Sequence, residues 1–555
     1  MAGYGADALN IHQQQPSAWP LLLAAFAVLG VSGFSLQFST GIDDAHITYF
    51  ASHMLANQSE ILNYNLERIE QSSSLLHVIL GALLSKITGM SAVAAGRVIP
   101  MLAGLLCLLL LNIFAIRQRL QTWPVMLCAS TSSFVYWNFA GLEAPLAALL
   151  LLTYILLLAE CLQNCHWRNI LLIIAAGTGL QMVRPEMVLF APALTISTSV
   201  FLFSRKQSQI KTVIVVCIIS LACAMSISLW RHWYFGDWFP QPVTAKSSGI
   251  TLTAIHNGLQ YVAQMITHPW TTLPVLIGIF ASIHIMWRAW RHQVSTALIS
   301  MSIAVIGYSA LIILMGGDWM PAGRLWVYII PLAAMTISYS FSILLPAKSF
   351  TRAMVTITVL NITGLISLAY SHITSINNMI ADRQTHITSP YSFFELHSPD
   401  NLSNIPTLEF LQPLLSQLLQ RQPGGITIMS GQMGMIPYHV SLQYPGKIRF
   451  TDRNALIDRK LTECAITRDL PRAQQGLDGL STVFFLKKSG ALQQQCNIQP
   501  ADIIFDLWWH HLIPETTEML ARHGYTVVFV QQGHTSSLQD QLVAVRTELW
   551  ATIAH

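Results

Sequence analysis

Long apolar runs separated by short polar loops make up the first two thirds of the chain. A helix needs about 20 mostly apolar residues to cross a bilayer, so these runs predict about eleven membrane spans. The expected spans are 19–37, 92–116, 123–138, 144–160, 169–183, 187–204, 211–229, 270–287, 294–315, 325–346 and 353–371. A shorter apolar stretch, 72–88, contains a His and a Lys and predicts a helix that either spans or lies in the interface. The pattern indicates an all-α polytopic membrane bundle.

Basic residues decide the orientation, because short loops rich in Lys and Arg stay cytoplasmic. If 72–88 lies in the interface or enters the membrane only partly, one face collects nearly all the dense basic clusters. These are RQR (117–119), HWR (166–168), RKQSQIK (205–211), WRAWRH (287–292) and AKSFTR (347–352). The N-terminus is then cytoplasmic and the C-terminus lies outside. The first apolar run follows no basic region and has no small-residue cleavage site, so we expect it to be retained as a helix.

The opposite face receives loops in which acids stand beside helix ends. They are GIDDAHITYF (41–50), NFAGLEAP (138–145), VRPEM (183–187), RHWYFGDWFPQPVTAK (231–246) and GGDWMPAGR (316–324). The simpler explanation is that acids occur wherever Lys and Arg do not. That explanation accounts for any one loop better than for all five together, and a carboxylate near the hydrocarbon boundary is costly unless it is paired, hydrated or functional.

From about residue 375 the sequence becomes polar, which divides the chain into a membrane part, 1–374, and a tail, 375–555, long enough for one domain. Strand patterns alternate with helix patterns in the tail and predict an α/β domain. Strands are expected at 426–431, 482–488, 501–509 and 525–532, and helices near 405–420, 452–463 and 515–523.

Composition supports a membrane protein, since 53% of the 555 residues are hydrophobic and only 10% are charged. The net charge of +4 comes with no Lys/Arg block that could follow a phosphate backbone, which excludes a nucleic-acid partner. Cys464 and Cys496 are the only cysteines of the tail. In an oxidising compartment they could form a disulfide, and the sequence alone leaves this open.

The acid pair Asp43 and Asp44 opens a segment whose apolar spacing predicts a helix along the interface. Asp43 is the expected N-cap of that helix. A helix N-terminus needs only one capping carboxylate, so capping explains one acid of the pair better than it explains both. A carboxylate here could take a proton from an acceptor hydroxyl while a cation holds a phosphate leaving group. Predicted outer cations are Arg184, Lys246 and Arg324, and candidate acids are Asp44, Glu143, Asp237 and Asp318.

These motifs resemble a known family. DDAHITYFASHMLAN (43–57), followed by NYNLERIEQSSSLL (63–76), is similar to the first outer loop of polyprenyl-phosphate-sugar-dependent glycosyltransferases of the GT-C superfamily. The pattern most resembles that of the mycobacterial terminal β-(1→2) arabinofuranosyltransferase group. GLEAP, VRPE, YFGDWFPQPVTAK, GGDWMPAGR and the tail segment 431–456 resemble further signatures of this group in matching order. The resemblance covers most of the chain.

The resemblance implies sugar transfer from a polyprenyl-phosphate donor to a glycan or glycolipid acceptor, on the periplasmic face of a bacterial inner membrane. By matching, the base falls on Asp43 or Asp44, and we favour Asp44. With the charge inventory, the matched motifs assign donor binding to Arg324, Lys246, Arg184 and Arg68, and acceptor binding or support to Glu143, Glu186, Asp237, Asp318 and His46.

Two positions depart from the family pattern. His46 replaces an aromatic residue, and we expect it to be solvated, although it could assist the acid. Gln71 replaces a glycine. Some GT-C enzymes use a divalent cation at the first-loop acid, but this sequence has no metal-ligand spacing, so a metal cofactor is left open.

Three other functions compete with a transferase. A transporter or flippase usually places charges near the membrane midplane and often has an internal repeat, and the sequence has neither. An O-antigen ligase or polymerase would also act outside but should lack the acid pair as its first outer feature. If the protein served only in assembly, with its spans as an anchor, the acids of the five loops would have no function.

Overall fold

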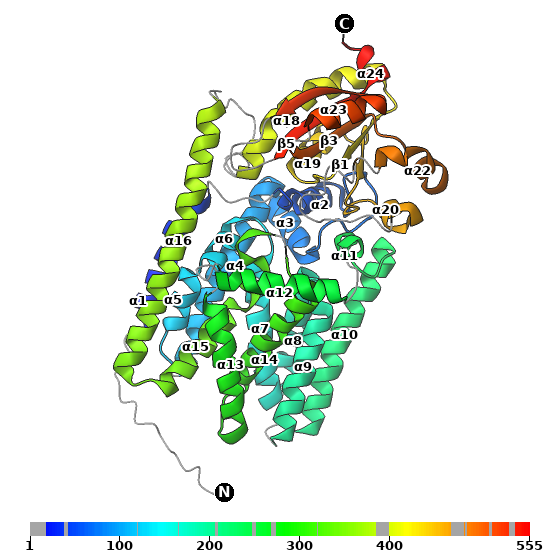
Figure 1. Cartoon of the computed structure of the whole chain (residues 1–555). Coiled ribbons are helices and arrows are strands. Elements are labelled where there is room, and N and C mark those ends of the chain that lie inside the picture. The colour runs from blue at the N-terminus through cyan, green and yellow to red at the C-terminus, as the bar shows by residue number, and fades with distance from the viewer. Residues whose placement is uncertain are drawn as a thin grey trace, which may run out of the picture.

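The fold was analysed in a computed structural model of the chain. The structure describes residues 18–37, 43–118, 120–164, 166–205, 209–246, 251–267, 273–318, 320–383, 399–467, 482, 485–509, 513–531 and 539–554. A bundle of long helices carries a smaller α/β domain at one end, which lies at the top of Figure 1. This confirms the predicted architecture of an all-α membrane bundle followed by an α/β tail.

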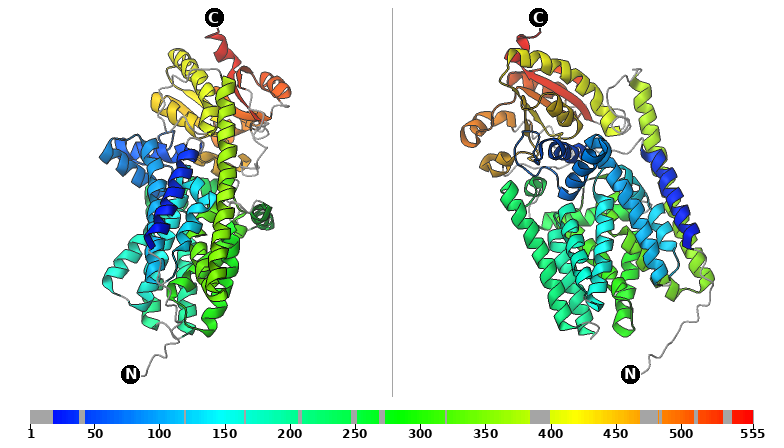
Figure 2. Two further views of the ribbon diagram at one scale, coloured as in Figure 1. Left: turned by 90° about the vertical axis from the view of Figure 1, so that its left-hand side faces the viewer. Right: turned by 180° about the vertical axis from the view of Figure 1, so that it is seen from behind.

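The bundle contains most of the predicted spans. Eight helical stretches of the described chain are long and apolar enough to cross a membrane. They comprise α4 (Ala92–Arg117), α7 (Ala144–Gln163), α9 (Met187–Ser204), α10 (Ile210–Phe235), α13 (Leu273–Arg291), α14 (Thr296–Met315), α15 (Ile330–Leu344) with the end of the 3-10 helix η2 (Pro321–Ile329), and α16 (Ala347–Arg383). Three further apolar helices are outside this set: α1 (Ala18–Gln37), of which only a shorter stretch qualifies as apolar, α3 (Leu75–Thr88) and α8 (Trp167–Val183). In the two side views α1 lies along α16 (Figure 2).

The expectation of one continuous span over 123–138 is wrong. This segment forms two eight-residue helices, α5 (Trp123–Ser130) and α6 (Ser132–Phe139). They meet at Thr131, whose extended backbone ends the first helix. The hydroxyls of Ser130 and Thr131 both donate to the carbonyl of Leu127. Such local side-chain hydrogen bonds compete with the helical ladder, which explains the break.

Shorter helices lie at the end of the bundle nearest the tail. α2 (Ala45–Gln58) is the helix predicted after the acid pair, and it lies between the bundle and the α/β domain (Figure 1). α11 (Gln241–Lys246) and α12 (Leu252–Thr267) follow α10, and the sequence analysis identified neither. α12 lies across the long helices in Figure 1, as expected for a helix at a membrane surface.

The tail contains a five-stranded sheet with strand order β2-β1-β3-β5-β4. β1 pairs in parallel with β2 and β3, whereas β5 runs antiparallel to β3 and β4. The strands are β1 (Ile426–Ser430), β2 (Ile448–Asp452), β3 (Ile503–Trp509), β4 (Tyr525–Gln531) and β5 (Gln539–Arg546). The helices are α18 (Pro399–Arg421), α19 (Met435–Gln443), α20 (Arg459–Glu463), η3 (Ala465–Thr467), α22 (Ser489–Cys496), α23 (Ile513–Arg522) and α24 (Thr547–Ala551).

Several tail predictions need correction. Residues 485–487 are helical, so the strand expected at 482–488 is wrong. Phe485 and Leu486 are both buried there, and a short apolar run does not by itself distinguish a strand from a buried helix. The helix expected at 452–463 is reduced to α20. The division at residues 374 and 375 stays a prediction, because α16 runs through it.

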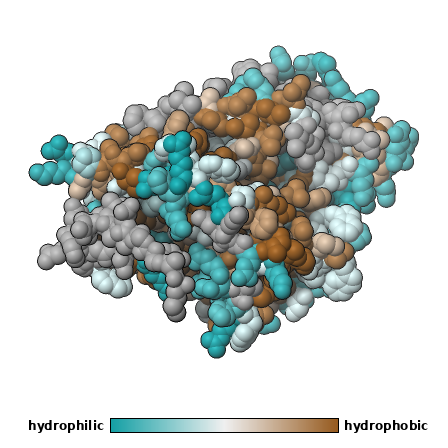
Figure 3. Space-filling model, turned by 90° about the horizontal axis from the view of Figure 1, so that it is seen from below, coloured by the Kyte–Doolittle hydropathy of each residue, from teal (hydrophilic) through white to brown (hydrophobic). Residues whose placement is uncertain are grey.

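The two ends of the bundle differ in charge as predicted. The basic loops follow α4, α9 and α13 and precede α8 and α16, at the end away from the tail (Figures 1 and 2). Seen from that end, hydrophilic side chains form patches among hydrophobic helix flanks (Figure 3). The acidic loops lie at the opposite end, next to the α/β domain. In that domain Cys464 and Cys496 form a disulfide, with their Cα atoms 5.6 Å apart.

Candidate active site at the tail end of the bundle

The two adjacent acids of the first loop have different surroundings. Asp43 Oδ1 accepts a hydrogen bond of 2.8 Å from the backbone N–H of Met435, the first residue of α19. Asp44 is half-buried, and its carboxylate has no hydrogen-bond or ion-pair partner among the residues that the structure describes. Asp43 is therefore committed to the tail, whereas Asp44 is available for chemistry.

This arrangement corrects the predicted capping. Asp44, not Asp43, occupies the N-cap position of α2, and its side chain makes no capping hydrogen bond. Asp43 caps a helix, but the helix is α19 of the distant tail. A carboxylate at a helix N-terminus is favourable because it satisfies a free N–H and faces the positive end of the helix dipole.

His46 is buried rather than solvated, contrary to expectation. Only 2% of its surface is exposed, and its ring lies 5.4 Å from those of Tyr49 and Tyr438. Its Nδ1 is 3.2 Å from the carbonyl oxygen of Asp43. Burial lowers the pKa of His46 to about 3, and the nearby His439 adds to this effect. His46 is thus neutral near pH 7 and supports the turn that carries the acids.

A buried ion cluster lies where α7, α8 and α9 meet. Arg184 Nη1 donates to Glu143 over 2.8 Å, and its Nε donates to Glu186 over 3.0 Å. Tyr308 of α14 also donates to Glu186, over 3.1 Å. Burial alone would raise the pKa of Glu143, but Arg184 and then Arg324 lower it below its usual value. Glu143 is therefore a carboxylate, and Arg184 is held by two anions.

Arg324 and Asp318 form a second pair beside this cluster. Arg324 Nε donates to Asp318 Oδ2 over 2.8 Å, and its guanidinium lies 5.9 Å from the ring centre of Trp137. Within the described chain this ion pair uses Nε alone, so the two terminal nitrogens remain available. A guanidinium with two such donors can bind a phosphate in bidentate fashion.

Hydrogen bonds connect the acid-bearing helix with the ion cluster. Tyr49 of α2 donates its hydroxyl to the carbonyl of Gly141 over 3.0 Å, two residues before Glu143. Arg97 of α4, which is buried, donates to the carbonyl of Phe139 over 3.1 Å. Asp44 and the cluster are thus parts of one polar region at the same end of the bundle.

Three other predicted residues lie apart from the cluster. Arg68 is exposed, pairs with Glu60 over 2.5 Å and lies over the ring of Tyr234. Asp237 pairs with Arg459 of the tail. Lys246 is an exposed cation at the end of α11. The structure therefore brings Glu143, Arg184, Glu186, Asp318 and Arg324 together, and it places Arg68, Asp237 and Lys246 away from them.

The sequence analysis missed the pair Glu70 and Arg231. Arg231 Nε lies 3.0 Å from Glu70 Oε2, and both side chains are almost completely buried. The carbonyl of Glu70 also accepts from the backbone N–H of Gln241 over 3.0 Å. Burial raises the pKa of Glu70 to about 7, although Arg231 opposes this shift. Both residues lie in motifs quoted above. They are 161 positions apart in the sequence, so only the fold shows that they are partners.

No group of three His, Cys, Asp or Glu side chains that could hold a metal ion occurs in the described parts of the chain. At the first-loop acids, Asp43 Oδ1 already accepts from Met435. The divalent cation that the sequence analysis left open stays a prediction.

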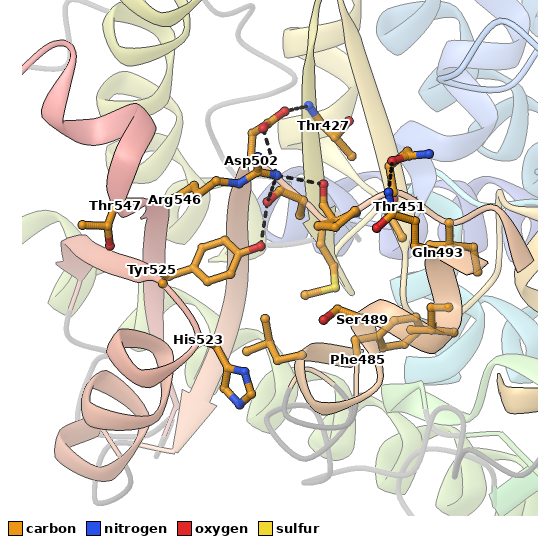
Figure 4. Close-up of a pocket in the computed structure, with 18 of the residues that line it drawn as sticks. Thr427, Thr451, Phe485, Ser489, Gln493, Asp502, His523, Tyr525, Arg546 and Thr547 are labelled. Atoms are coloured by element: carbon orange, nitrogen blue, oxygen red, sulfur yellow. Dashed lines mark hydrogen bonds and ion pairs between the residues drawn. The ribbon is translucent and has the colours of Figure 1, made fainter. Parts of the chain in front are cut away.

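The tail has a cavity of its own, of about 840 Å³, lined by residues of the α/β domain alone. Figure 4 shows Arg546 in its wall, with its guanidinium 3.3 Å from Asp502 and Tyr525 nearby. Tyr525 in turn donates to the carbonyl of Ala501 over 2.6 Å. Because its main charges are paired and the bundle contributes nothing to its wall, this cavity is separate from the site around Asp44.

Comparison with known proteins gave structural matches only. No protein-family model and no curated protein sequence matches the chain. The chain is similar in fold to ArnT from Cupriavidus metallidurans, in the apo state, with a TM-score of 0.49 and 13% identity over 96% of this chain and 99% of ArnT. ArnT bound to undecaprenyl phosphate matches with a TM-score of 0.45, 13% identity, and 96% and 98% coverage.

An oligosaccharyltransferase from Archaeoglobus fulgidus, in complex with Zn and sulfate, has a TM-score of 0.49 and 11% identity over 91% of this chain and 72% of its own. The narrower resemblance to the mycobacterial group stays a prediction. Similarity at this level describes the arrangement of the chain and assigns no activity to it.

Proposed function

We propose that the protein is an integral-membrane glycosyltransferase that moves a sugar from a polyprenyl-phosphate donor to a glycan or glycolipid acceptor. In this proposal Asp44 is the general base that removes a proton from the acceptor hydroxyl. The observation that carries it is the contrast within the acid pair. Asp43 is used as a cap, whereas Asp44 keeps a half-buried carboxylate without a partner among the described residues.

The cation of the donor site is Arg324. Its two terminal nitrogens extend beyond the ion pair with Asp318 and provide donors for the phosphate that leaves with the lipid. Arg184, in contrast, serves to fix the helix ends, because Glu143 and Glu186 already occupy its Nη1 and Nε. Apolar helix flanks below this region would hold the polyprenyl chain in the bilayer while its head group reaches the charged end.

The reaction takes place outside the cytoplasm. The disulfide between Cys464 and Cys496 supports an oxidising compartment for the tail, since such bonds are rare in the cytosol. The basic loops at the other end of the bundle support the same orientation. For a bacterium, the proposed location of the site is the periplasmic face of the inner membrane, with the N-terminus cytoplasmic.

The test is complementation of a deletion strain. Wild type should restore a surface glycan that the deletion strain lacks, whereas Asp44→Asn should reduce transfer by at least 100-fold, because the amide cannot accept the proton. Glu60→Gln is the matched control, since Glu60 is an exposed acid near the same loop. Surface glycans would be compared by mass spectrometry, with the amount of inserted protein measured in parallel.

Full activity of Asp44→Asn would remove the assignment of the base. A deletion strain that accumulates lipid-linked sugar in the cytoplasmic leaflet alone would instead indicate a flippase and would contradict transfer.

A further inference from the structure

The first outer loop and the tail are joined by a network of specific contacts. Asn65 forms two hydrogen bonds with the backbone of Phe450 in β2, one of 2.7 Å from its N–H and one of 2.9 Å to its carbonyl. Asn63 donates to the carbonyl of Ile457 over 2.9 Å, and Arg449 pairs with Glu67 over 3.2 Å. The loop thus binds the edge strand β2 and the segment after it through side chains that bond to their backbone.

The contact at Asp43 is tighter than the others. A Cβ atom added to Gly434 would lie 2.0 Å from Asp43 Oδ2 and 2.3 Å from its backbone oxygen. Only glycine therefore lets the N-terminus of α19 approach the acid pair. Tyr64 adds to this junction, since its hydroxyl donates to the carbonyl of Gly434 over 3.3 Å.

We propose that the tail is part of the catalytic machinery, because α19 positions Asp44 through its hydrogen bond to Asp43. This inference rests on the proposed function. Asp43 is a positioning residue, and Gly434 is the residue that permits the contact. In this proposal the tail contributes to catalysis through its contact with the acid pair.

The backbone transmits the position from one acid to the next. The carbonyl of Asp43 accepts from the N–H of His46 over 3.1 Å, and that of Asp44 accepts from Ile47 over 3.2 Å. Both acids therefore belong to one turn, and fixing the first fixes the second. A shift of about 1 Å in a catalytic group can cost on the order of 100-fold in rate, so loss of the cap should show in kcat.

The first experiment uses a pair of glycine variants in the full-length protein. Gly434→Ala should lower kcat at least tenfold with little change in the KM for the lipid donor, because Arg324 and the helix ends are not displaced. Gly424→Ala is the control, since a Cβ there meets no atom within 4 Å. Equal kcat values in the two variants would overturn the proposal.

The second experiment separates capping from proton transfer. Asp43→Asn keeps an oxygen that can accept from Met435 and should recover most of the kcat that Asp43→Ala loses. If Asp43→Asn is as inactive as Asp44→Asn, Asp43 itself is the base and the positioning role is wrong. If Asp43→Ala keeps the wild-type kcat, the contact has no role in catalysis.

A third measurement does not depend on activity. In the double variant Glu67→Cys with Arg449→Cys, a short bifunctional maleimide should join the two positions in the intact protein, because their native side chains meet over 3.2 Å. Gly434→Ala should retain this cross-link if the tail still folds and docks. Absence of this cross-link in the otherwise wild-type chain would overturn docking. Lack of any sugar transfer by wild type would contradict the proposed function, whereas normal transfer by Gly434→Ala would contradict only this inference.

Discussion

At the scale of single residues, the ion pair between Arg184 and Glu143 shows how charge is kept at the end of the bundle. Both side chains are at least nine-tenths buried, and each is compensated by its partner. Desolvation makes a buried pair a poor source of net stability, but it makes an unpaired member very costly. The loop that carries Glu143 and the loop that carries Arg184 are thus held in one arrangement.

Glu143→Gln should accordingly destabilise the protein by about 3–5 kcal/mol, because Arg184 loses an anion in a buried position. Thermal unfolding in detergent, followed by tryptophan fluorescence, would measure the shift. Glu160→Gln on the same helix is the control, because Glu160 is exposed. An equal melting temperature for both variants would contradict the structural role of the pair.

At the scale of elements, α2 and α19 meet through two histidines. His46 and His439 lie with ring centres 6.4 Å apart, and burial lowers their pKa values to about 3 and about 4. In the unfolded chain both would bind a proton below about pH 6.5. Stability from this interface is therefore present above pH 6.5 and is lost as the pH falls toward 4.

The double variant His46→Gln with His439→Gln should lose stability less steeply than wild type between pH 6.5 and 5.5. The expected difference is about 1 kcal/mol for each histidine over that interval, because the unfolded imidazole is only half protonated at pH 6.5. Buried acids such as Glu70 and Asp452 have raised pKa values and change stability in the opposite sense. The measured quantity is therefore the difference in melting temperature between variant and wild type at each pH, and parallel curves would contradict the prediction.

The elements also show which features sequence alone can predict. Apolar runs of about 20 residues predicted the long helices, because length and apolar composition are the main requirements for a helix that crosses a bilayer. Thr131 broke one span through local hydrogen bonds, which hydropathy does not report. Strand β5 was missed because its polar residues, such as Gln541, are buried by pairing with a neighbouring strand rather than marked by alternation.

The candidate site, too, was predictable only where it depends on local sequence. Loop position predicted that Glu143, Arg184 and Arg324 would lie at one end, because helix ends fix where short loops lie. The pairing of Asp43 with Met435 and of Asp237 with Arg459 was not predictable, since it depends on how a separate domain docks. Sequence patterns do not show which residues of two such distant segments face each other.

At the scale of the whole molecule, the orientation can be tested at two exposed positions. Lys246→Cys lies at the tail end and Arg168→Cys at the basic end of the bundle. In intact cells a maleimide that cannot cross membranes should label position 246 but not 168, with the parent chain as the background. Both positions should react after the membrane is made permeable, and labelling of position 168 alone would reverse the topology.

The contact between Asp43 and Met435 joins residues 392 positions apart. A ribosome makes the first of these long before it reaches the second. Newly inserted chains therefore wait with an unfinished acid turn until synthesis is almost complete. If transfer depends on this turn, as proposed above, a chain that stops before α19 would insert its helices without being able to transfer a sugar.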